Sequence, residues 1–171
     1  MVQDSIKNFI IQDGEDDNDI LHRKLFDVNM RLFDINKKYN KLVLDTVNYM
    51  KKLAKKRFED YTPAMGISCA NVGLPFNIIG ALDENKKWNF FLNPEFLKKS
   101  TKKEVVKSNC GSLLLKEPIK IERYKWVQLE YYNLKGEKEL EYFEDRYGRT
   151  LQHEVDHNNG ILITSVKRRV V

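Results

Sequence analysis

Hydrophobic positions divide the chain into a helical first third and a remainder that is rich in short apolar runs. Between roughly Tyr39 and Arg57, apolar residues recur at the i, i+4, i+7 and i+11 spacing of one helix face. These residues are Val43, Val47, Met50 and Ala54. The spacing predicts one amphipathic helix over Tyr39–Arg57, which ends before Pro63.

The short apolar runs after Pro63 are typical of β-strands. Asn93 and Pro94 are expected to close one of these strands, and Asn133–Gly136 has the composition of a hairpin turn. We therefore expect strands at Phe76–Leu82, Trp88–Leu92, Ile119–Tyr124, Trp126–Tyr132 and Lys138–Phe143.

Helical spacing returns near the C-terminus, where Tyr147, Leu151 and Val155 repeat every four residues. No proline interrupts this stretch, and the Asn-Asn-Gly sequence that follows is typical of a helix end. The pattern predicts a helix over Glu144–His157 and then a short strand over Ile161–Val166.

The order of these elements, without an internal repeat or a long linker, predicts one α+β domain over residues 1–171. Its antiparallel strands and β-hairpin are expected to pack around the C-terminal helix, with the amphipathic helix in the N-terminal part. The acidic, turn-rich residues 1–19 are expected to be loosely ordered.

Composition adds constraints on class and compartment. The 171 residues are 42% hydrophobic, enough for one core, and 30 Lys or Arg against 25 Asp or Glu give a net charge of +5. Both signs are mixed along most of the chain, and no helix-turn-helix or stacked-aromatic signature supports a nucleic-acid-binding module.

The chain lacks a membrane-length apolar run and a signal-like start, and its two cysteines, Cys69 and Cys110, cannot form a disulfide framework. We expect a soluble cytoplasmic protein.

The strongest chemical signal is an H-E-x-x-H arrangement formed by His153, Glu154 and His157. Helix positions four apart lie about 6 Å from each other on one face, so both imidazoles can reach one divalent cation. Glu154 would then lie beside the metal-bound solvent as a general base. The pattern fixes only three positions, so a chance match is the alternative, but the helix predicted around it favours a metal site.

Two other segments could complete such a site. Catalytic metal sites usually have three protein ligands, and Cys110 is a candidate for the third, although a lone cysteine is more often a small buried hydrophobic residue. The same alternative applies to Cys69. Small residues surround Asn71 between Gly66 and Gly73, and its amide could donate a hydrogen bond to a developing oxyanion. The alternative for this segment is a tight turn packed under the sheet.

Taken in this order, the three segments resemble the motifs of peptide deformylases. The third motif is intact as QHEVDH at Gln152–His157, with Arg149 and Gly160 also in familiar places. The first motif has Asn71 where the family has glutamine. The second motif, EGCLS in the family, reads SNCGS at Ser108–Ser112 and keeps only the cysteine and the last serine.

The resemblance implies a metal-dependent hydrolase that removes the N-formyl group from the N-terminal methionine of newly made polypeptides. It implies one divalent metal, with iron(II) preferred in the family and zinc, nickel or cobalt as replacements. It assigns Cys110, His153 and His157 as ligands, Glu154, Asn71 and the Gly111 backbone to catalysis, and Met65, Gly66, Ile67 and Asn109 to substrate binding.

The implied partner is the formyl-methionyl nascent chain, with a transient ribosome contact, no membrane and no specific nucleic acid. In a eukaryotic host an organellar matrix would be the alternative location. The altered residues at Ser108, Asn109, Gly111 and Asn71 also leave open a weakened or inactive metal protein that binds peptide N-termini. An ordinary H-E-x-x-H metalloprotease is a third hypothesis, which Asp156 and the upstream cysteine fit poorly.

Overall fold

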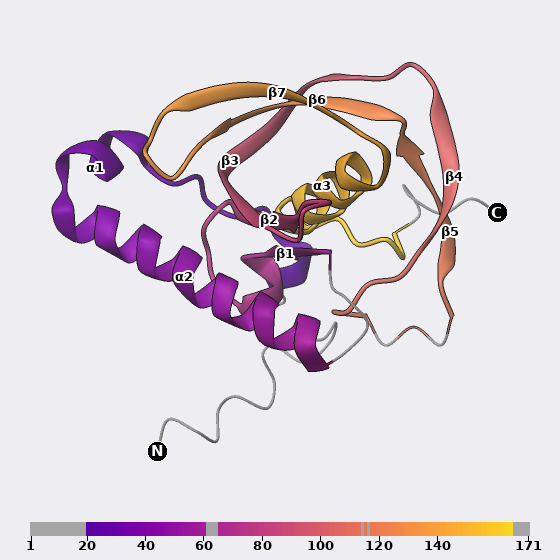
Figure 1. Cartoon of the computed structure of the whole chain (residues 1–171), viewed down its shortest axis with the longest axis horizontal. Coiled ribbons are helices and arrows are strands. Elements are labelled where there is room, and N and C mark those ends of the chain that lie inside the picture. Colours follow the sequence, from indigo (N-terminus) through magenta and orange to yellow (C-terminus); the bar gives the residue numbers. More distant parts are fainter. Residues whose placement is uncertain (1–19, 61–64, 114, 116, 166–171) are drawn as a thin grey trace.

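The computed structural model describes residues 20–60, 65–113, 115 and 117–165. A five-stranded antiparallel sheet, in the order β1-β2-β3-β6-β7, curves over the helix α3, and β4 and β5 form a separate ribbon (Figure 1). The elements are η2 (Ile20–His22), α1 (Met30–Ile35), α2 (Lys37–Asp60), β1 (Gly66–Ser68), η3 (Ala70–Val72), β2 (Ile78–Leu82), β3 (Trp88–Lys99), β4 (Lys103–Ser108), β5 (Ile119–Tyr124), β6 (Trp126–Tyr132), β7 (Lys138–Glu144) and α3 (Asp145–Asn158).

The predicted α+β class is confirmed, and so is the predicted amphipathic helix, which α2 extends by a few residues at each end. All four residues of its predicted apolar face are buried. The short helix α1 was not predicted, because it is less than two turns long and buries only Phe33. Asn29 caps it by accepting a hydrogen bond from the Leu32 N–H at 3.1 Å. No helix in the described part of the chain is long and apolar enough to cross a membrane.

The predicted β-hairpin is also confirmed. β6 and β7 pair over seven positions, from Trp126 opposite Glu144 to Tyr132 opposite Lys138. In the turn, Gly136 has a φ of 85°, which a residue with a side chain rarely adopts. The hairpin lies over α3, where Phe143 and Tyr131 pack against Phe91 of β3.

Two predicted strand boundaries are wrong: β2 begins at Ile78 and not at Phe76, and β3 does not end at Leu92. β3 runs through Asn93 and Pro94 to Lys99, because a bulge between Leu92 and Glu95 accommodates the positive φ of Asn93. The Asn93 side chain accepts from the Val28 N–H at 2.7 Å and donates to the Val28 carbonyl at 2.8 Å. The bulge at Asn93 therefore bends β3, and the Asn93 side chain fixes the strand to the N-terminal segment at Val28.

The final strand predicted at Ile161–Val166 is not a strand over residues 161–165, and Val166 lies outside the described residues. Gly160 has a φ of 69° and packs against the His22 backbone, where a Cβ would lie 2.6 Å from the carbonyl carbon. The Ile161 N–H then bonds to the Asp156 carbonyl at 2.9 Å. The helix thus ends in a compact turn that buries Leu162 and Ile163.

The ribbon of β4 and β5 carries the loop that faces α3. Its six residue pairs run from Lys103 opposite Tyr124 to Ser108 opposite Ile119. β5 was predicted and β4 was not, because no residue of β4 is fully buried and its sequence, KEVVKS, places two adjacent valines between charged residues instead of alternating apolar with polar positions. The chain leaves β4 at Ser108 and reaches Cys110 two residues later. The prediction that residues 1–19 are loosely ordered lies outside the described residues.

Candidate metal centre

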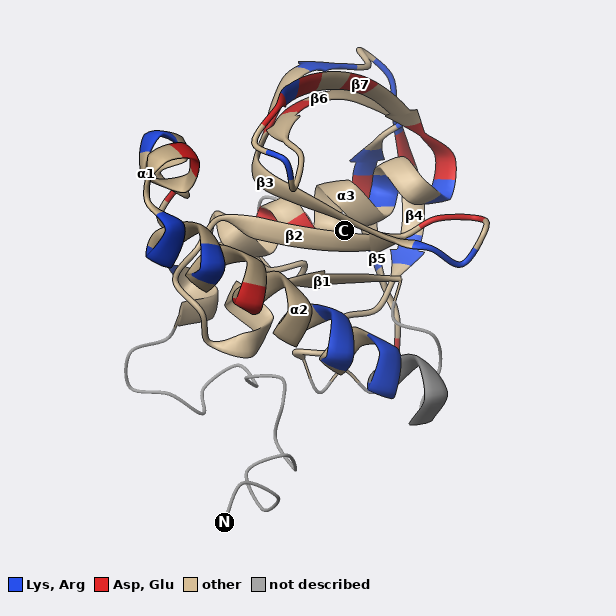
Figure 2. Ribbon diagram, turned by 60° about the vertical axis from the view of Figure 1, so that its left-hand side comes forward, with Lys and Arg blue, Asp and Glu red and all other residues tan. Residues whose placement is uncertain are grey.

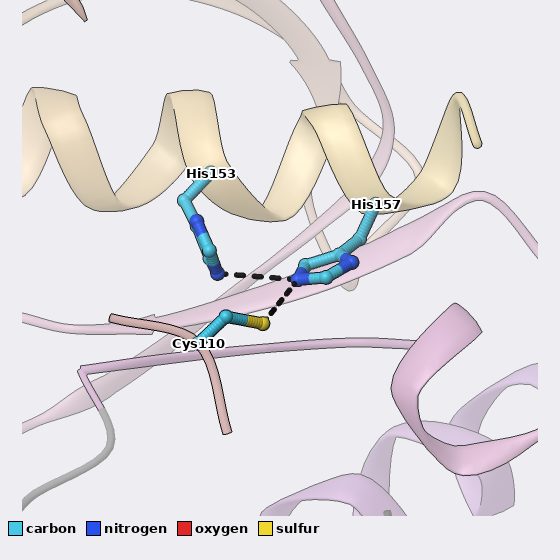
Figure 3. A group of neighbouring side chains, drawn as sticks. All are labelled: Cys110, His153 and His157. Atoms are coloured by element: carbon cyan, nitrogen blue, oxygen red, sulfur yellow. Dashed lines mark hydrogen bonds between the residues drawn. The ribbon is translucent and has the colours of Figure 1, made fainter. Parts of the chain in front are cut away.

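Three donor side chains meet between α3 and the loop after β4 (Figure 3). The Nε2 atoms of His153 and His157 are 3.1 Å apart, and Cys110 Sγ lies 3.2 Å from His157 Nε2. All three donor atoms lie within 4.8 Å of one another. In a tetrahedral site with the usual metal–ligand bonds, donor atoms lie about 3.4 to 3.6 Å apart. The spacing and the chemistry of this donor set therefore fit one divalent metal.

The protonation states suit ligation by the imidazoles. Burial, together with the nearby positive charge of Arg123, lowers the pKa of His157 to about 4 and that of His153 well below its usual value. Both rings are therefore neutral at pH 7. Burial raises the pKa of the Cys110 thiol to about 11, and the charge of Glu154 contributes to this rise. A metal must then displace the thiol proton when it binds.

A buried ion pair joins α3 to β5. Arg123 of β5 is only 2% exposed, and its Nη1 donates to the Asp156 carboxylate. Its Nη2 lies 3.5 Å from His153 Nδ1, on the ring edge opposite the donor atom. Arg123 was not among the site residues predicted from the sequence. The available signal was alternation along β5, which places Arg123 on the same inward face as Ile121.

Two further side chains fasten α3 to the ribbon. The Gln152 amide accepts from the Tyr124 N–H and donates to the Tyr124 carbonyl, both at 2.9 Å, as a neighbouring strand would. Arg149 forms an ion pair with Glu104 of β4 at 2.6 Å. These contacts explain why glutamine and arginine accompany the histidines. They fix the helix relative to both strands that flank the Cys110 loop.

Glu154 lies against the first strand of the sheet. A Cβ at Gly66 would lie 2.6 Å from Glu154 Cγ, so only glycine allows this approach. Glu154 is 4% exposed, and its negative charge contributes to the raised pKa of the Cys110 thiol. Glu154 is thus buried next to His153 in α3, within electrostatic range of the donor group.

β1 is the edge strand on this side of the sheet. The Leu82 N–H bonds to the Met65 carbonyl and the Cys69 N–H to the Ile78 carbonyl. In an antiparallel ladder the alternate residues, Gly66 and Ser68, face away from β2. The Ser68 N–H is taken by the Asn71 side chain at 3.0 Å, so Gly66 is the residue that directs its N–H and C=O groups to the open edge. Met65 and Gly66 are partly exposed, whereas Ile67 is buried.

Asn71 lies in η3 and is buried with its amide already in use. Its Oδ1 accepts from the Ser68 N–H at 3.0 Å and from the Ser68 hydroxyl at 2.7 Å. Its Nδ2 donates to the Ser112 hydroxyl at 2.7 Å. The amide therefore joins β1 to the loop that carries Cys110. A primary amide has two N–H groups, so its role as an oxyanion donor stays a prediction that rests on the second one.

The Cys110 loop is exposed on both sides of the cysteine. Asn109 and Gly111 are exposed, and Asn109 Oδ1 accepts from the Cys110 N–H at 2.8 Å. Ser112 is buried, and hydrogen bonds from its backbone and hydroxyl oppose the rise in the Cys110 pKa. Ser112 therefore touches both Cys110 and Asn71. No role was predicted for Ser112 from the sequence, although it is the serine of the family motif and is kept here.

Cys69 is not part of the donor group. It is completely buried, its Sγ lies 3.4 Å from Met50 Sδ, and burial raises its pKa to about 12. These observations agree with the alternative of a small buried hydrophobic residue.

Asn158, next to His157, is a third residue to which the sequence assigned no role at the site. It is 1% exposed, and its Nδ2 donates to Asn77 Oδ1 and to the Ile78 carbonyl, both at 3.1 Å. Its Oδ1 accepts from the Ala70 N–H at 3.4 Å. Asn158 thus fixes the end of α3 to β2 and to the turn that presents Asn71.

Comparisons with known proteins agree with this arrangement. Residues 10–170 match the family model described as polypeptide deformylase. The chain is 33% identical over 118 residues to a peptide deformylase of Pseudothermotoga lettingae, covering 68% of this chain and 66% of that protein. A peptide deformylase of Rhodopseudomonas palustris is 27% identical over 144 residues, with 77% of this chain and 82% of that protein covered.

Solved structures share the fold over nearly the whole chain. A peptide deformylase from Thermotoga maritima superimposes with a TM-score of 0.76 at 25% identity, covering 95% of this chain and 97% of that one. A class I type b peptide deformylase from Acinetobacter baumannii, bound to Met-Ala-Ser, gives a TM-score of 0.72 at 25% identity, with 90% of this chain and 93% of that one covered.

Proposed function

Because the chain belongs to the peptide deformylase family, whose members are metal-dependent enzymes that act on nascent polypeptides, we propose that it removes the N-formyl group from the N-terminal methionine of new chains. The observation that carries this proposal is the meeting of three metal donors, Cys110, His153 and His157, at the helix that also carries the buried Glu154. The chemistry is hydrolysis of a formamide C–N bond.

We propose Cys110, His153 and His157 as the metal ligands and iron(II) as the metal in the cell, with zinc, nickel or cobalt as replacements. One thiolate and two imidazoles suit all of these ions, so the preference for iron rests on the family resemblance. Cys110, His153 and His157 would hold the metal, which would supply a water of lowered pKa and polarise the formyl oxygen.

Glu154 is proposed as the group that takes the proton from the attacking water and returns it to the departing amine. Its burial beside Gly66 keeps bulk water away from the carboxylate. Asn71 and the backbone N–H of Gly111 are proposed to donate hydrogen bonds to the oxyanion. For Asn71 the support is its hydrogen bond to Ser112, two residues after Cys110 in the loop.

We propose that the substrate main chain adds to the open edge of β1 beside Met65, Gly66 and Ile67. Gly66 supports this, because its backbone polar groups point to that edge next to Glu154. Asn109 is proposed to contact the substrate from the Cys110 loop. The complex of the A. baumannii relative with Met-Ala-Ser shows that a relative accepts a methionine-led peptide.

The proposed setting is the cytoplasm, with brief contact at the ribosome, where formylated chains begin. We set aside the inactive alternative, because no described feature favours it over an active site. The ordinary metalloprotease hypothesis is set aside as well, because the family match covers the whole motif region.

The test is hydrolysis of a formyl-Met tripeptide by protein loaded with iron(II) or nickel in the absence of oxygen. Glu154→Ala, prepared identically, is expected to lose activity by about 10²- to 10⁴-fold, the usual contribution of a general acid–base group. Its metal content should equal that of the wild type. A folded, fully metallated wild type without turnover would overturn the proposal.

A further inference from the structure

The basic charge of the protein is unevenly distributed. Residues 96–125 contain nine Lys or Arg and three Glu, whereas the whole chain has a net charge of +5. This segment therefore carries a net +6, and α2, with eight Lys or Arg and three Asp or Glu, carries a net +5. The segment over residues 96–125 includes β4, β5 and the loop that carries Cys110, and Figure 2 shows basic residues along these strands.

Lysines gather on the outward face of the ribbon. Lys107 of β4 lies directly opposite Lys120 of β5, and like charges at directly opposed positions destabilise a β-pair. Both side chains are exposed. On this face the two strands carry one acidic residue, Glu122, and it already pairs with Lys103 at 3.0 Å. The Lys107–Lys120 pair is thus a local excess of positive charge that an external anion would relieve.

A second concentration lies at the other end of the ribbon. The Lys99 and Lys103 ammonium groups lie 5.3 Å and 5.5 Å from the centre of the same Tyr124 ring. Lys98, Lys102 and Lys125 are exposed in the adjoining turn and strand. The two concentrations lie at opposite ends of one six-residue ribbon, about 16 to 20 Å long at the usual rise per residue.

We propose that this outward face, the basic ribbon, binds the phosphate backbone of RNA. Nucleic acids carry regularly spaced negative charges at high density, so one strand can contact the lysines at both ends of this short ribbon. An acidic peptide carries its charges more sparsely and matches this surface less well. Lysines also protect exposed strand edges from pairing, but that role does not require two of them to face each other. The ribbon leads directly into the Cys110 loop, so RNA bound there lies beside the proposed active site.

The test compares two variants with the same net charge. Lys102→Gln/Lys107→Gln/Lys120→Gln changes the ribbon, and Lys37→Gln/Lys38→Gln/Lys52→Gln removes three exposed lysines from α2. Binding of a fluorescent RNA hairpin is measured for the metal-loaded protein at salt concentrations from about 50 to 200 mM. Thermal unfolding and turnover of a formyl-Met tripeptide are measured on the same samples.

The ribbon variant is expected to bind RNA at least about tenfold more weakly than the wild type. The slope of log K against log salt should become less steep by about two, because each of the three lost phosphate contacts contributes about 0.7 to 0.9. The α2 variant should stay close to wild type. Turnover of the free tripeptide should be equal in all three proteins, so failure of this inference is distinguishable from failure of the proposed enzyme activity.

Three results would overturn the proposal. Equal losses in both variants would mean a diffuse effect of net charge. An absence of wild-type binding at about 150 mM salt would mean that the lysines serve only solvation or edge protection. Competition by poly-glutamate as strong as that by RNA would assign the surface to acidic polypeptides instead.

Discussion

The two sides of the metal centre are held in different ways. The helix side carries His153 and His157 on α3, which is fixed by the buried Arg123–Asp156 pair and by the Gln152 amide. The loop side carries Cys110 between exposed neighbours and is held by single hydrogen bonds, such as that between Asn71 and Ser112. The helix side is thus part of the fold itself. Substitutions there should unfold the protein, whereas substitutions on the loop side should impair metal binding and leave the fold intact.

The largest expected effect is on the helix side. Asp156→Asn removes the negative charge that compensates the buried Arg123 guanidinium, and breaking a buried pair in this way typically costs about 3 to 5 kcal/mol. The free energy of unfolding of the metal-free protein should fall by that amount in urea titrations.

Two controls sharpen this prediction. The double variant Arg123→Met/Asp156→Leu removes both charges and should recover much of the lost stability. Lys41→Ala breaks the exposed Lys41–Asp45 pair and should change stability by less than about 1 kcal/mol. An Asp156→Asn protein as stable as the wild type would contradict the view that the helix side belongs to the fold.

The next effect is on the loop side. Cys110→Ala should weaken metal binding by more than about 100-fold. Loss of a residue that only hydrogen-bonds to a metal ligand costs about 10- to 100-fold in affinity, and Cys110 is proposed as a ligand itself. The unfolding free energy of the metal-free protein should change by about 1 kcal/mol or less. Cys69→Ala is the matched control, since it removes the other buried thiol and should leave metal affinity unchanged. Equal losses of affinity in both variants would contradict the assignment of Cys110.

A smaller effect is expected at Ser112. Ser112→Ala removes a hydroxyl that touches Cys110 and Asn71, so metal affinity and kcat should each fall by about tenfold. Ser68→Ala removes a different partner of Asn71 and has no contact with the thiol, so it should lower kcat with metal affinity unchanged. Chelator competition and steady-state kinetics separate the two outcomes. If Ser68→Ala also released the metal, Asn71 would be a structural support of the loop rather than a catalytic group.

Elements specified by local pattern were predictable from the sequence, and those specified by distant contacts were not. The periodicity of α2 and the turn at Asn133–Gly136 are local signals, and both elements formed as expected. β3 continues past Pro94 because Asn93 bonds to Val28, which is 65 positions away in the chain. No short window of sequence contains that contact.

The candidate site divides in the same way. The histidines and Glu154 stand in one helical motif, so their common face follows from spacing alone. Cys110 was a weaker candidate, and the structure brings it to the histidines through the ribbon. Arg123 could not be paired with Asp156 in advance, because the contact joins two elements that are 33 positions apart. Ser112 likewise acquires its partners only when η3 meets the loop.

Changes of pH are expected to separate the two sides once more. On the helix side, both histidines have a lower pKa when folded than the value of about 6.5 in an unfolded chain. As pH falls from about 6.5 to about 4, the unfolded state binds more protons than the folded state, so the metal-free protein should lose stability across that window.

On the loop side, the Cys110 thiol, with its pKa raised to about 11, must lose its proton to the metal. Metal affinity should therefore rise about tenfold per pH unit near neutrality. Cobalt titrations of wild type and Cys110→Ala at about pH 7 and 8 measure this slope, and acid unfolding followed by circular dichroism measures the other effect. Cys110→Ala should flatten the slope of affinity while keeping the acid-induced loss of stability. If one variant removed both pH effects, the thiol and the imidazoles would titrate as one unit, and the separation of the centre into two independent sides would be wrong.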